Sequence, residues 1–242
     1  MHDGSATFRE RLDRSSKRLL DISVACVLGI ALLPVSLVVA LVIRLDTPGP
    51  IFYRCRRTGH RRSEFQMLKF RKMFDAASGS ALTARDDQRF TRVGRYLARS
   101  KLDEIPQLWN VLRGEMSLVG PRPEDPRFVD ACAGFDTVFT VKPGVTGLAQ
   151  LAFARESEIL SRDDPEADYV ERILPQKVAL DSLYARRRTM AMDLRILWWT
   201  MHAVVFRQSV AVDRSSGRAR VRRRPSPERR PVAAPVKVKV PR

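Results

Sequence analysis

The chain opens with polar, mostly basic residues and then changes abruptly to an uncharged apolar segment. Residues 22–43, ISVACVLGIALLPVSLVVALVI, contain no charged side chain and show no polar face. A straight helix of this length would be about 33 Å long, enough to cross a hydrocarbon core of about 30 Å. The pattern predicts a membrane helix, in preference to the core helix of a soluble domain or a cleavable signal peptide.

Pro34 lies near the middle of this segment, where it removes one backbone hydrogen bond and predicts a kink. Basic residues flank both ends, and the positive-inside rule favours keeping both on the cytoplasmic side. Half-helices of about 18 and 15 Å would then enter and leave by the same face, with the Ser23 or Ser36 hydroxyl available to freed backbone groups. We therefore favour a re-entrant hairpin over 19–45, with a single span as the alternative.

Beyond the turn signal TPGP, shorter elements indicate an α+β, mainly helical fold. Segments 51–57 and 64–70 bracket a polar turn and predict a β-hairpin. Further expectations are helices at about 90–113, 126–138 and 166–208, a loop or short helix over 75–88, and a turn at 142–147 leading into a short strand, GLAQLAF. Trp198 and Trp199 suggest an amphipathic interfacial helix, with ordinary core packing as the alternative.

Composition adds a strong basic bias. The chain has 44 Lys and Arg against 27 Asp and Glu, a formal net charge of +17. This surplus favours an anionic partner: nucleic acid, an anionic membrane surface or a phosphorylated substrate. A nucleic-acid binder does not explain residues 22–43, and no recognition motif accompanies the charge, so we expect no nucleic acid as partner.

The C-terminal residues 213–242 carry much of this charge. They are rich in Arg, Lys and Pro and contain no aromatic residue, so they cannot build a packed core. We expect a disordered basic tail. It either grips anionic lipid or is a solubilising extension without further function.

Several common enzyme classes are excluded. The three cysteines are far apart and form no CxxC pair, and the three histidines give a Ser-His-Asp or HExxH enzyme little to work with. Neither a GxGxxG nor a Walker A motif occurs. The cysteine usage favours a reducing, cytosolic side.

The candidate chemistry concentrates in residues 99–124, RSKLDEIPQLWNVLRGEMSLVGPRPE. Asp103 and Glu104 precede Pro106, which predicts that they lie near a helix N-terminus, where free N–H groups and the helix dipole favour a phosphate. Adjacent carboxylates also offer oxygen ligands to Mg²⁺, which takes one or two carboxylates together with substrate phosphates. Alternatively, Asp103 only caps the helix and Glu104 only favours its first turn.

Basic residues beside turns surround this pair and favour the phosphate interpretation. Pro121 and Pro123 hold Arg122 in an extended segment that suits presentation of a guanidinium to phosphate. The other candidates for binding the substrate's phosphates are Lys69, Arg71, Arg89, Arg99 and Lys142.

At these residues the sequence resembles a known family. LDEIPQLWNVLRGEMSLVGPRPE, preceded by RRTGHRRSEFQMLKFRKM and TARDDQRFTRVGR and followed by KPGVTGLAQ, looks like the bacterial sugar transferases. These are the monotopic polyprenyl-phosphate phosphoglycosyl transferases. The match runs in order from about residue 18 to 205, and the chain is similar to the minimal catalytic form of the family.

The resemblance implies an enzyme that moves a sugar-1-phosphate from a nucleotide sugar, usually a UDP-sugar, to a polyprenyl phosphate such as undecaprenyl phosphate. The products are polyprenyl-diphospho-sugar and UMP, at the start of exopolysaccharide, O-antigen or related glycan assembly. Mg²⁺ dependence is implied, with Asp103 as a covalent nucleophile, Glu104 as the metal ligand, and Lys69 and Arg122 stabilising phosphate charge. A catalytically inactive, membrane-anchored scaffold of a polysaccharide assembly complex is the alternative.

The implied organisation is a basic segment (1–18), the re-entrant helix (19–45), a catalytic domain (46–212) and the tail. The resemblance places the catalytic domain on the cytoplasmic face of the bacterial inner membrane, in contact with membrane lipid. Downstream glycosyltransferases are possible partners.

The chain departs from the family's pattern at three positions. Leu33 precedes Pro34 where members often carry Ser, and Lys72 replaces Ser in the segment KFRKM. Ala98 stands where many members have Arg, five residues before Asp103. The neighbouring Arg99 is not an automatic substitute, since one helical step is a rotation of about 100°. Which residue replaces that Arg, with Lys101 among the candidates, is left open.

Overall fold

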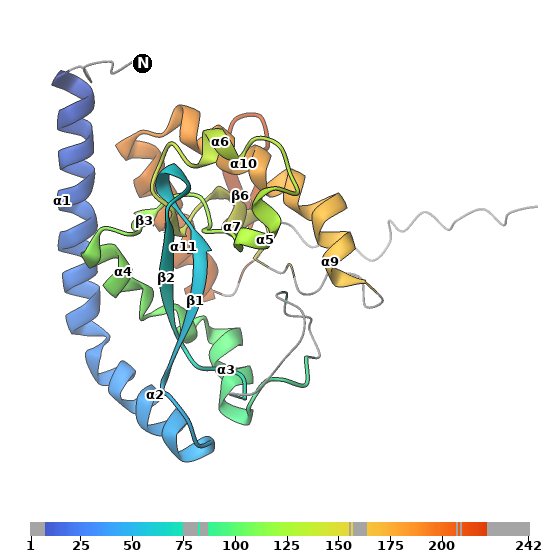
Figure 1. Cartoon of the computed structure of the whole chain (residues 1–242). Coiled ribbons are helices and arrows are strands. Elements are labelled where there is room, and N and C mark those ends of the chain that lie inside the picture. The colour runs from blue at the N-terminus through green and yellow to red at the C-terminus, as the bar shows by residue number, and fades with distance from the viewer. Residues whose placement is uncertain are drawn as a thin grey trace, which may run out of the picture.

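A computed structural model describes residues 8–74, 82, 87–154, 156, 164–206, 208 and 210–221, with side chains from Ser15 onward. These residues are mainly helical with three two-stranded sheets, an α+β arrangement. Figure 1 shows the long helix α1 (Phe8–Ala31) along one side of the body, a bend into α2 (Leu33–Asp46), and the β1–β2 hairpin in front of the body.

The predicted kink is present. Ser15–Ala31 and Leu33–Asp46 meet at 59°. Pro34 falls in the first turn of α2, where its missing N–H removes no helical hydrogen bond of that helix, and the Ser36 hydroxyl donates to the Leu32 carbonyl over 2.9 Å. Among the described residues, neither helix alone has the length and apolarity to cross a bilayer, whereas the bent pair together does.

Polar residues of α1 attach this helix to the body. Arg18 donates to the carbonyls of Val111 and Leu112 over 2.6 and 2.8 Å, at the C-terminal end of α4, where a cation is favourable. Asp21 accepts the backbone N–H of Leu118 over 3.1 Å. The predicted boundary between residues 18 and 19 therefore falls inside one continuous helix, α1. The polar residues around this boundary bond to the body of the protein, and the uncharged apolar residues follow them directly in the same helix.

Strands confirm the predicted hairpin and add two small sheets. β1 (Phe52–Thr58) and β2 (Glu64–Phe70) pair antiparallel with Phe52 opposite Phe70, around the 3₁₀ turn η1 (His60–Arg62). β3 (Ser117–Val119) pairs in parallel with β4 (Gly144–Thr146), and β5 (Val210–Val212) pairs antiparallel with β6 (Ala219–Val221).

The remaining elements are short helices packed around these strands. They are α3 (Arg92–Ser100), the 3₁₀ turn η2 (Leu102–Glu104), α4 (Gln107–Arg113), α5 (Pro126–Val129), α6 (Phe135–Val138), α7 (Leu148–Ala152), α9 (Pro165–Asp168), the π-helical η3 (Tyr169–Ile173), α10 (Leu174–Arg187) and α11 (Met190–Phe206). The largest apolar core joins residues of β2, α4, β3, α7 and α10, such as Met67, Val111, Leu118, Leu148 and Leu180.

The predicted helices are more divided than expected. The helix over 90–113 is interrupted at Lys101, which adopts a left-handed conformation with φ 61° and ends α3. The helix over 126–138 is two separate turns, and that over 166–208 is broken between α10 and α11. The predicted loop over 75–88 lies mostly outside the described residues.

The strand predicted for GLAQLAF is wrong. Those residues form α7, and the strand is the preceding Gly144–Thr146. The reason is a close backbone approach: a Cβ on Gly144 would lie 2.0 Å from the backbone nitrogen of Gly120. Only glycine permits this spacing, so the chain pairs with β3 at residues 144–146 and is free to turn helical afterwards.

The predicted start of the basic tail also needs correction. Residues 210–221 form the β5–β6 hairpin, and Gly217 (φ 68°) sets its turn against Leu148, Leu183 and Met192. The boundary at residue 213 therefore falls inside an ordered hairpin. Residues 222–242 lie outside the described residues.

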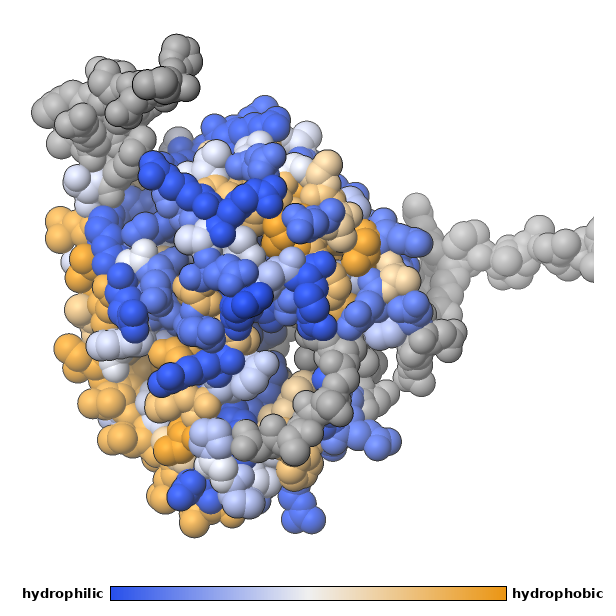
Figure 2. Space-filling view, in the orientation of Figure 1, coloured by the Kyte–Doolittle hydropathy of each residue, from blue (hydrophilic) through white to orange (hydrophobic). Residues whose placement is uncertain are grey.

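Exposed apolar side chains gather on α2 and the second half of α1. Ile30, Leu37 and Leu45 are 74%, 63% and 77% exposed, and Figure 2 shows this hydrophobic surface at the lower left, over both helices. In α11, Trp198 is exposed while Trp199 packs against the core. The tryptophan pair thus divides between the two predicted alternatives.

Candidate active site

Asp103 and Glu104 lie side by side on η2, between α3 and α4. The left-handed Lys101 redirects the chain after α3, and Pro106 is the N-cap residue of α4, with no side-chain capping bond there. Asp103 is almost completely buried. Because Pro106 and not Asp103 is the N-cap of α4, the structure does not support the alternative in which Asp103 serves only as a helix cap.

Glu104 faces two cations from separate elements. Lys69, near the end of β2, places its Nζ 3.5 Å from Glu104 Oε1, and Arg122, after β3, places its Nη2 3.4 Å from the same oxygen. Burial acts to raise the pKa of Glu104, but the charges of Lys69 and Arg122 hold that pKa well below its usual range. Glu104 is therefore ionised.

Burial also changes the pKa of the neighbouring cation, Lys69. It lowers the pKa of Lys69 to about 8, with the nearby Glu104 opposing the shift. Burial also acts to lower the pKa of Arg122, but the negative charges of Glu104, Glu156 and Glu124 raise that pKa above its ordinary value. At neutral pH both side chains are cations directed at one place, as stabilisation of a phosphate group requires.

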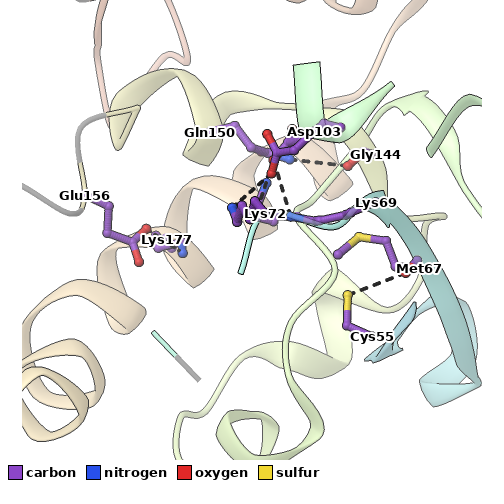
Figure 3. A network of polar contacts seen from close by, with 11 residues as sticks. Cys55, Met67, Lys69, Lys72, Asp103, Gly144, Gln150, Glu156 and Lys177 are labelled. Carbon is purple, nitrogen blue, oxygen red and sulfur yellow. Dashed lines mark hydrogen bonds and ion pairs between the residues drawn. The ribbon is translucent and has the colours of Figure 1, made fainter. Parts of the chain in front are cut away.

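Asp103 faces a different cation. Lys72 Nζ lies 2.9 Å from Asp103 Oδ2, and the two side chains point toward one another in Figure 3. The second oxygen, Oδ1, is buried and has no hydrogen-bond partner among the described residues. A carboxylate with one oxygen held and the other free is suited to act as a nucleophile or a metal ligand.

A buried polar network lies next to the segment that carries Arg122. The Tyr169 hydroxyl donates to Glu124 over 2.6 Å and accepts from Lys177 over 2.9 Å, and Lys177 also pairs with Glu156 at 3.0 Å (Figure 3). Burial raises the pKa of Tyr169 far above its usual value, so it remains a hydroxyl. The network connects α10 and η3 to the segment that carries Arg122.

The structure brings together four of the predicted residues: Lys69, Asp103, Glu104 and Arg122. Arg71 instead donates to the carbonyls of Thr47 and Pro48 over 2.9 and 2.6 Å, and so ties down the chain that leaves α2.

The other three lie in different surroundings. Arg89 pairs with Asp87 at 2.6 Å, and Arg99 is exposed on α3. Lys142 lies beside Arg18, where burial and that positive charge lower its pKa.

Sequence reasoning did not assign a site role to Lys72. It noted this residue only as a departure from the family's pattern. The signal that would have found it is its place directly after the strand that carries Lys69.

The residues fit a Mg²⁺ ion only together with a substrate. No group of three or more His, Cys, Asp or Glu side chains able to hold a metal occurs in the part of the chain that the structure describes. The unpartnered Asp103 Oδ1 and the ionised Glu104 are hard oxygen donors side by side. Such a pair suits Mg²⁺ that takes its remaining ligands from a diphosphate and water.

The chain belongs to the bacterial sugar transferase family, whose profile matches residues 12–207. It is 37% identical over 204 residues to the undecaprenyl-phosphate glucose phosphotransferase of Komagataeibacter xylinus, covering 80% of this chain and 36% of that protein. It is 37% identical over 195 residues to the UDP-glucose:undecaprenyl-phosphate glucose-1-phosphate transferase of Caulobacter vibrioides, covering 78% and 69%.

A third relative is the exopolysaccharide production protein ExoY of Sinorhizobium fredii. It is 36% identical over 209 residues, covering 78% of this chain and 85% of the relative. The chain thus spans little more than a third of the first relative's length and larger shares of the other two.

Proposed function

We propose that this chain is a phosphoglycosyl transferase that moves a sugar-1-phosphate from a UDP-sugar to a polyprenyl phosphate, giving polyprenyl-diphospho-sugar and UMP. The observation that carries the proposal is the pair formed by the buried Asp103 and the partly buried Glu104, met by Lys69, Lys72 and Arg122 within a family of sugar transferases. The names of the relatives support UDP-glucose and undecaprenyl phosphate as the first substrates to test.

The proposed reaction has two displacements at the same phosphorus. Asp103 Oδ1 attacks the β-phosphorus of the UDP-sugar, an Asp–O–P bond forms, and the bond from phosphorus to the bridging oxygen breaks, so that UMP leaves with that oxygen. A phosphate oxygen of the polyprenyl phosphate then attacks the same phosphorus and Asp103 leaves as a carboxylate. No proton transfer is needed, because each attacking group is already an anion.

The cations of the site act on the charge of the transferring group. Lys69 and Arg122, held by Glu104 in the free protein, are placed to neutralise the phosphate oxygens as the substrate enters. Glu104 would hold Mg²⁺, which would supply further charge neutralisation on the diphosphate when bound, while the free oxygen of Asp103 stays available for attack.

We also propose that α1 and α2 form a re-entrant membrane hairpin. Two observations support it. Arg18 and Asp21 attach the first limb to the body, while Asp46 accepts the backbone N–H of Val93 over 3.3 Å where the second limb ends. Because both limbs return to one body, we expect the body to lie on one side of the membrane, and the UDP-glucose in the name of one relative supports the cytoplasmic face.

An apolar groove between α2 and α3 is the proposed place for the lipid chain of the acceptor. It has a volume of about 400 Å³ and is lined by side chains such as Pro34, Val38, Val42, Tyr96 and Leu102. Leu102 directly precedes Asp103. An isoprenoid chain in this groove would bury its hydrocarbon while its phosphate reaches the nucleophile.

The test is UMP release in nanodiscs with Mg²⁺, polyprenyl phosphate and a panel of UDP-sugars that begins with UDP-glucose. Asp103→Asn should lose at least about 1,000-fold in kcat, because the amide is not a nucleophile. Asp136→Asn, at an exposed Asp that pairs with Arg62, is the matched control. Full activity of Asp103→Asn would refute the covalent route, and folded wild-type protein silent with every donor would favour the scaffold alternative.

A further inference from the structure

The two carboxylates of the site have separate cations. Lys69 and Arg122 both approach Glu104, whereas Lys72 approaches Asp103 and bonds only its Oδ2. The Lys72 side chain is 24% exposed and that of Asp103 is 2% exposed. An ion pair this sheltered from water is screened much less than a surface pair.

Helix α3 fixes Lys72 in this position. The Lys72 carbonyl accepts the backbone N–H of Thr91 over 3.1 Å. Gly94 packs directly on the same carbonyl, since a Cβ there would lie 1.8 Å from its oxygen. The Lys72 ammonium also lies over the Phe90 ring, 5.9 Å from its centroid. The chain that follows β2 is thus clamped where its lysine reaches Asp103.

We propose that Lys72 is the positioning residue of the nucleophile, and that it promotes chiefly the second half-reaction, in which the phosphosugar leaves Asp103 for the acceptor. This inference rests on the proposed covalent route.

The reason lies in where negative charge develops. In the second half-reaction the P–O bond to Asp103 breaks and its electron pair returns to the carboxylate, so the departing carboxylate gains the charge that the Lys72 ammonium stabilises. Without that cation the leaving group is worse and the adduct persists. During loading the charge moves the other way, from the carboxylate to the departing UMP, so there Lys72 mainly orients Oδ1 for attack.

The experiment separates the two half-reactions by rapid quench in nanodiscs. Enzyme is loaded with donor labelled in the sugar, in the absence of lipid acceptor, and protein-bound label is measured. Polyprenyl phosphate is then added and loss of protein-bound label is followed. We compare wild type, Lys72→Met, Lys72→Arg and Arg95→Met, the last removing one positive charge from an exposed side chain of α3.

Lys72→Met should discharge its adduct about 10- to 100-fold more slowly than wild type, the range expected for loss of a hydrogen bond between charged groups. Lys72→Arg should stay within about fivefold of wild type and Arg95→Met within about threefold, because the cation at Asp103 is kept in both. A disruption of the fold alone would lower the loaded fraction without slowing discharge of the adduct that does form.

Two results would overturn the inference. One is discharge by Lys72→Met at the wild-type rate. The other is a folded Lys72→Met protein that never loads, which would assign Lys72 to the first half-reaction. Failure of the proposed function is recognised separately, because wild type itself would then retain no label.

Discussion

The side chain of Asn110, in α4, accepts the backbone N–H of Leu68, in β2, over 3.0 Å. Its amide also donates to the carbonyl of Gln66 over 2.8 Å, so one buried side chain completes the free edge of β2 as a neighbouring strand would. The residue after Leu68 is Lys69, which faces Glu104 on the turn that leads into α4. Asn110 therefore fixes the distance between the two halves of the site.

Replacement of Asn110 by leucine should lower the free energy of unfolding by about 2–4 kcal/mol, because backbone groups of β2 and the Glu115 carboxylate lose partners in a buried setting. Urea unfolding followed by tryptophan fluorescence measures the change. Gln66→Ala is the control, since its exposed side chain is removed while its carbonyl stays. Equal stabilities of the two variants would contradict the proposed role of Asn110.

The pKa of Lys69, lowered by burial to about 8, predicts the pH dependence of activity. Below that pH the side chain is a cation able to hold phosphate, and above it the free enzyme loses the charge. We expect kcat/KM for the nucleotide sugar to fall about tenfold per pH unit above 8. Lys69→Arg should remove this fall, because a guanidinium stays charged, and the same change at exposed Lys101 should leave it in place.

Asp181, buried in α10, predicts a pH-dependent stability. Burial raises its pKa to about 8, opposed by the charge of Lys177, whereas an unfolded aspartate titrates near 4. The folded state thus keeps a proton that the unfolded state releases. The resulting stabilisation is complete below about pH 4 and is lost as pH rises through about 8.

Asp181→Asn removes this titration and keeps the shape of the side chain. The variant should gain on wild type as pH rises from 5 to 9. Each pH unit between 5 and 8 is worth about 1.4 kcal/mol, so from pH 5 to pH 9 the variant should gain about 4 kcal/mol on wild type, or about 8–16 °C in Tm for a chain of this size. Thermal unfolding of both proteins across this range is the measurement, and a Tm difference that does not change with pH would refute the assignment.

Filling the apolar groove should affect only the lipid substrate. Val38→Trp places a large ring in the groove and should raise KM for polyprenyl phosphate about tenfold, a cost of about 1.4 kcal/mol, while loading by donor alone is unchanged. Leu37→Trp, one residue away and outside the groove lining, is the matched control. Equal effects of the two variants would argue against this placement of the acceptor.

The proposed hairpin predicts that both of its limbs begin on the same side of the membrane. Single cysteines at Ser16 and Arg61, both exposed, are introduced after Cys26, Cys55 and Cys132 are changed to serine. A membrane-impermeant maleimide should label both positions from the cytoplasmic face only. Labelling of the two positions from opposite faces would establish a single span.

Features with a local cause were predictable from the sequence. The apolar segment and the break near Pro34 follow from composition and from one missing N–H, and the β1–β2 hairpin follows from two short apolar runs around a polar turn. The motif around Asp103 and Glu104 was recognisable because all its residues are contiguous. The division of the helix at Lys101 was not predictable, since a left-handed lysine leaves no mark in a pattern of apolar positions.

The pairing of charges across the site depended on tertiary structure. In a strand, side chains two apart share a face, so Lys69 and Arg71 looked equivalent. However, β2 ends at Phe70, and the next residues are held by contacts with the start of α3. Arg71 therefore donates to the carbonyls of Thr47 and Pro48. Lys72 instead pairs with Asp103.

The sequence by itself determined that this protein has an apolar segment broken near Pro34, a basic body and the adjacent carboxylates Asp103 and Glu104 within a contiguous motif, because each of these features can be read without the fold. Only the tertiary structure decided which cations meet which carboxylate: Lys69 and Arg122 for Glu104, and Lys72 for Asp103. Those contacts join residues far apart in the chain. They exist because Gly94 and the parallel β3–β4 pair allow backbones to approach so closely that the three segments converge on η2.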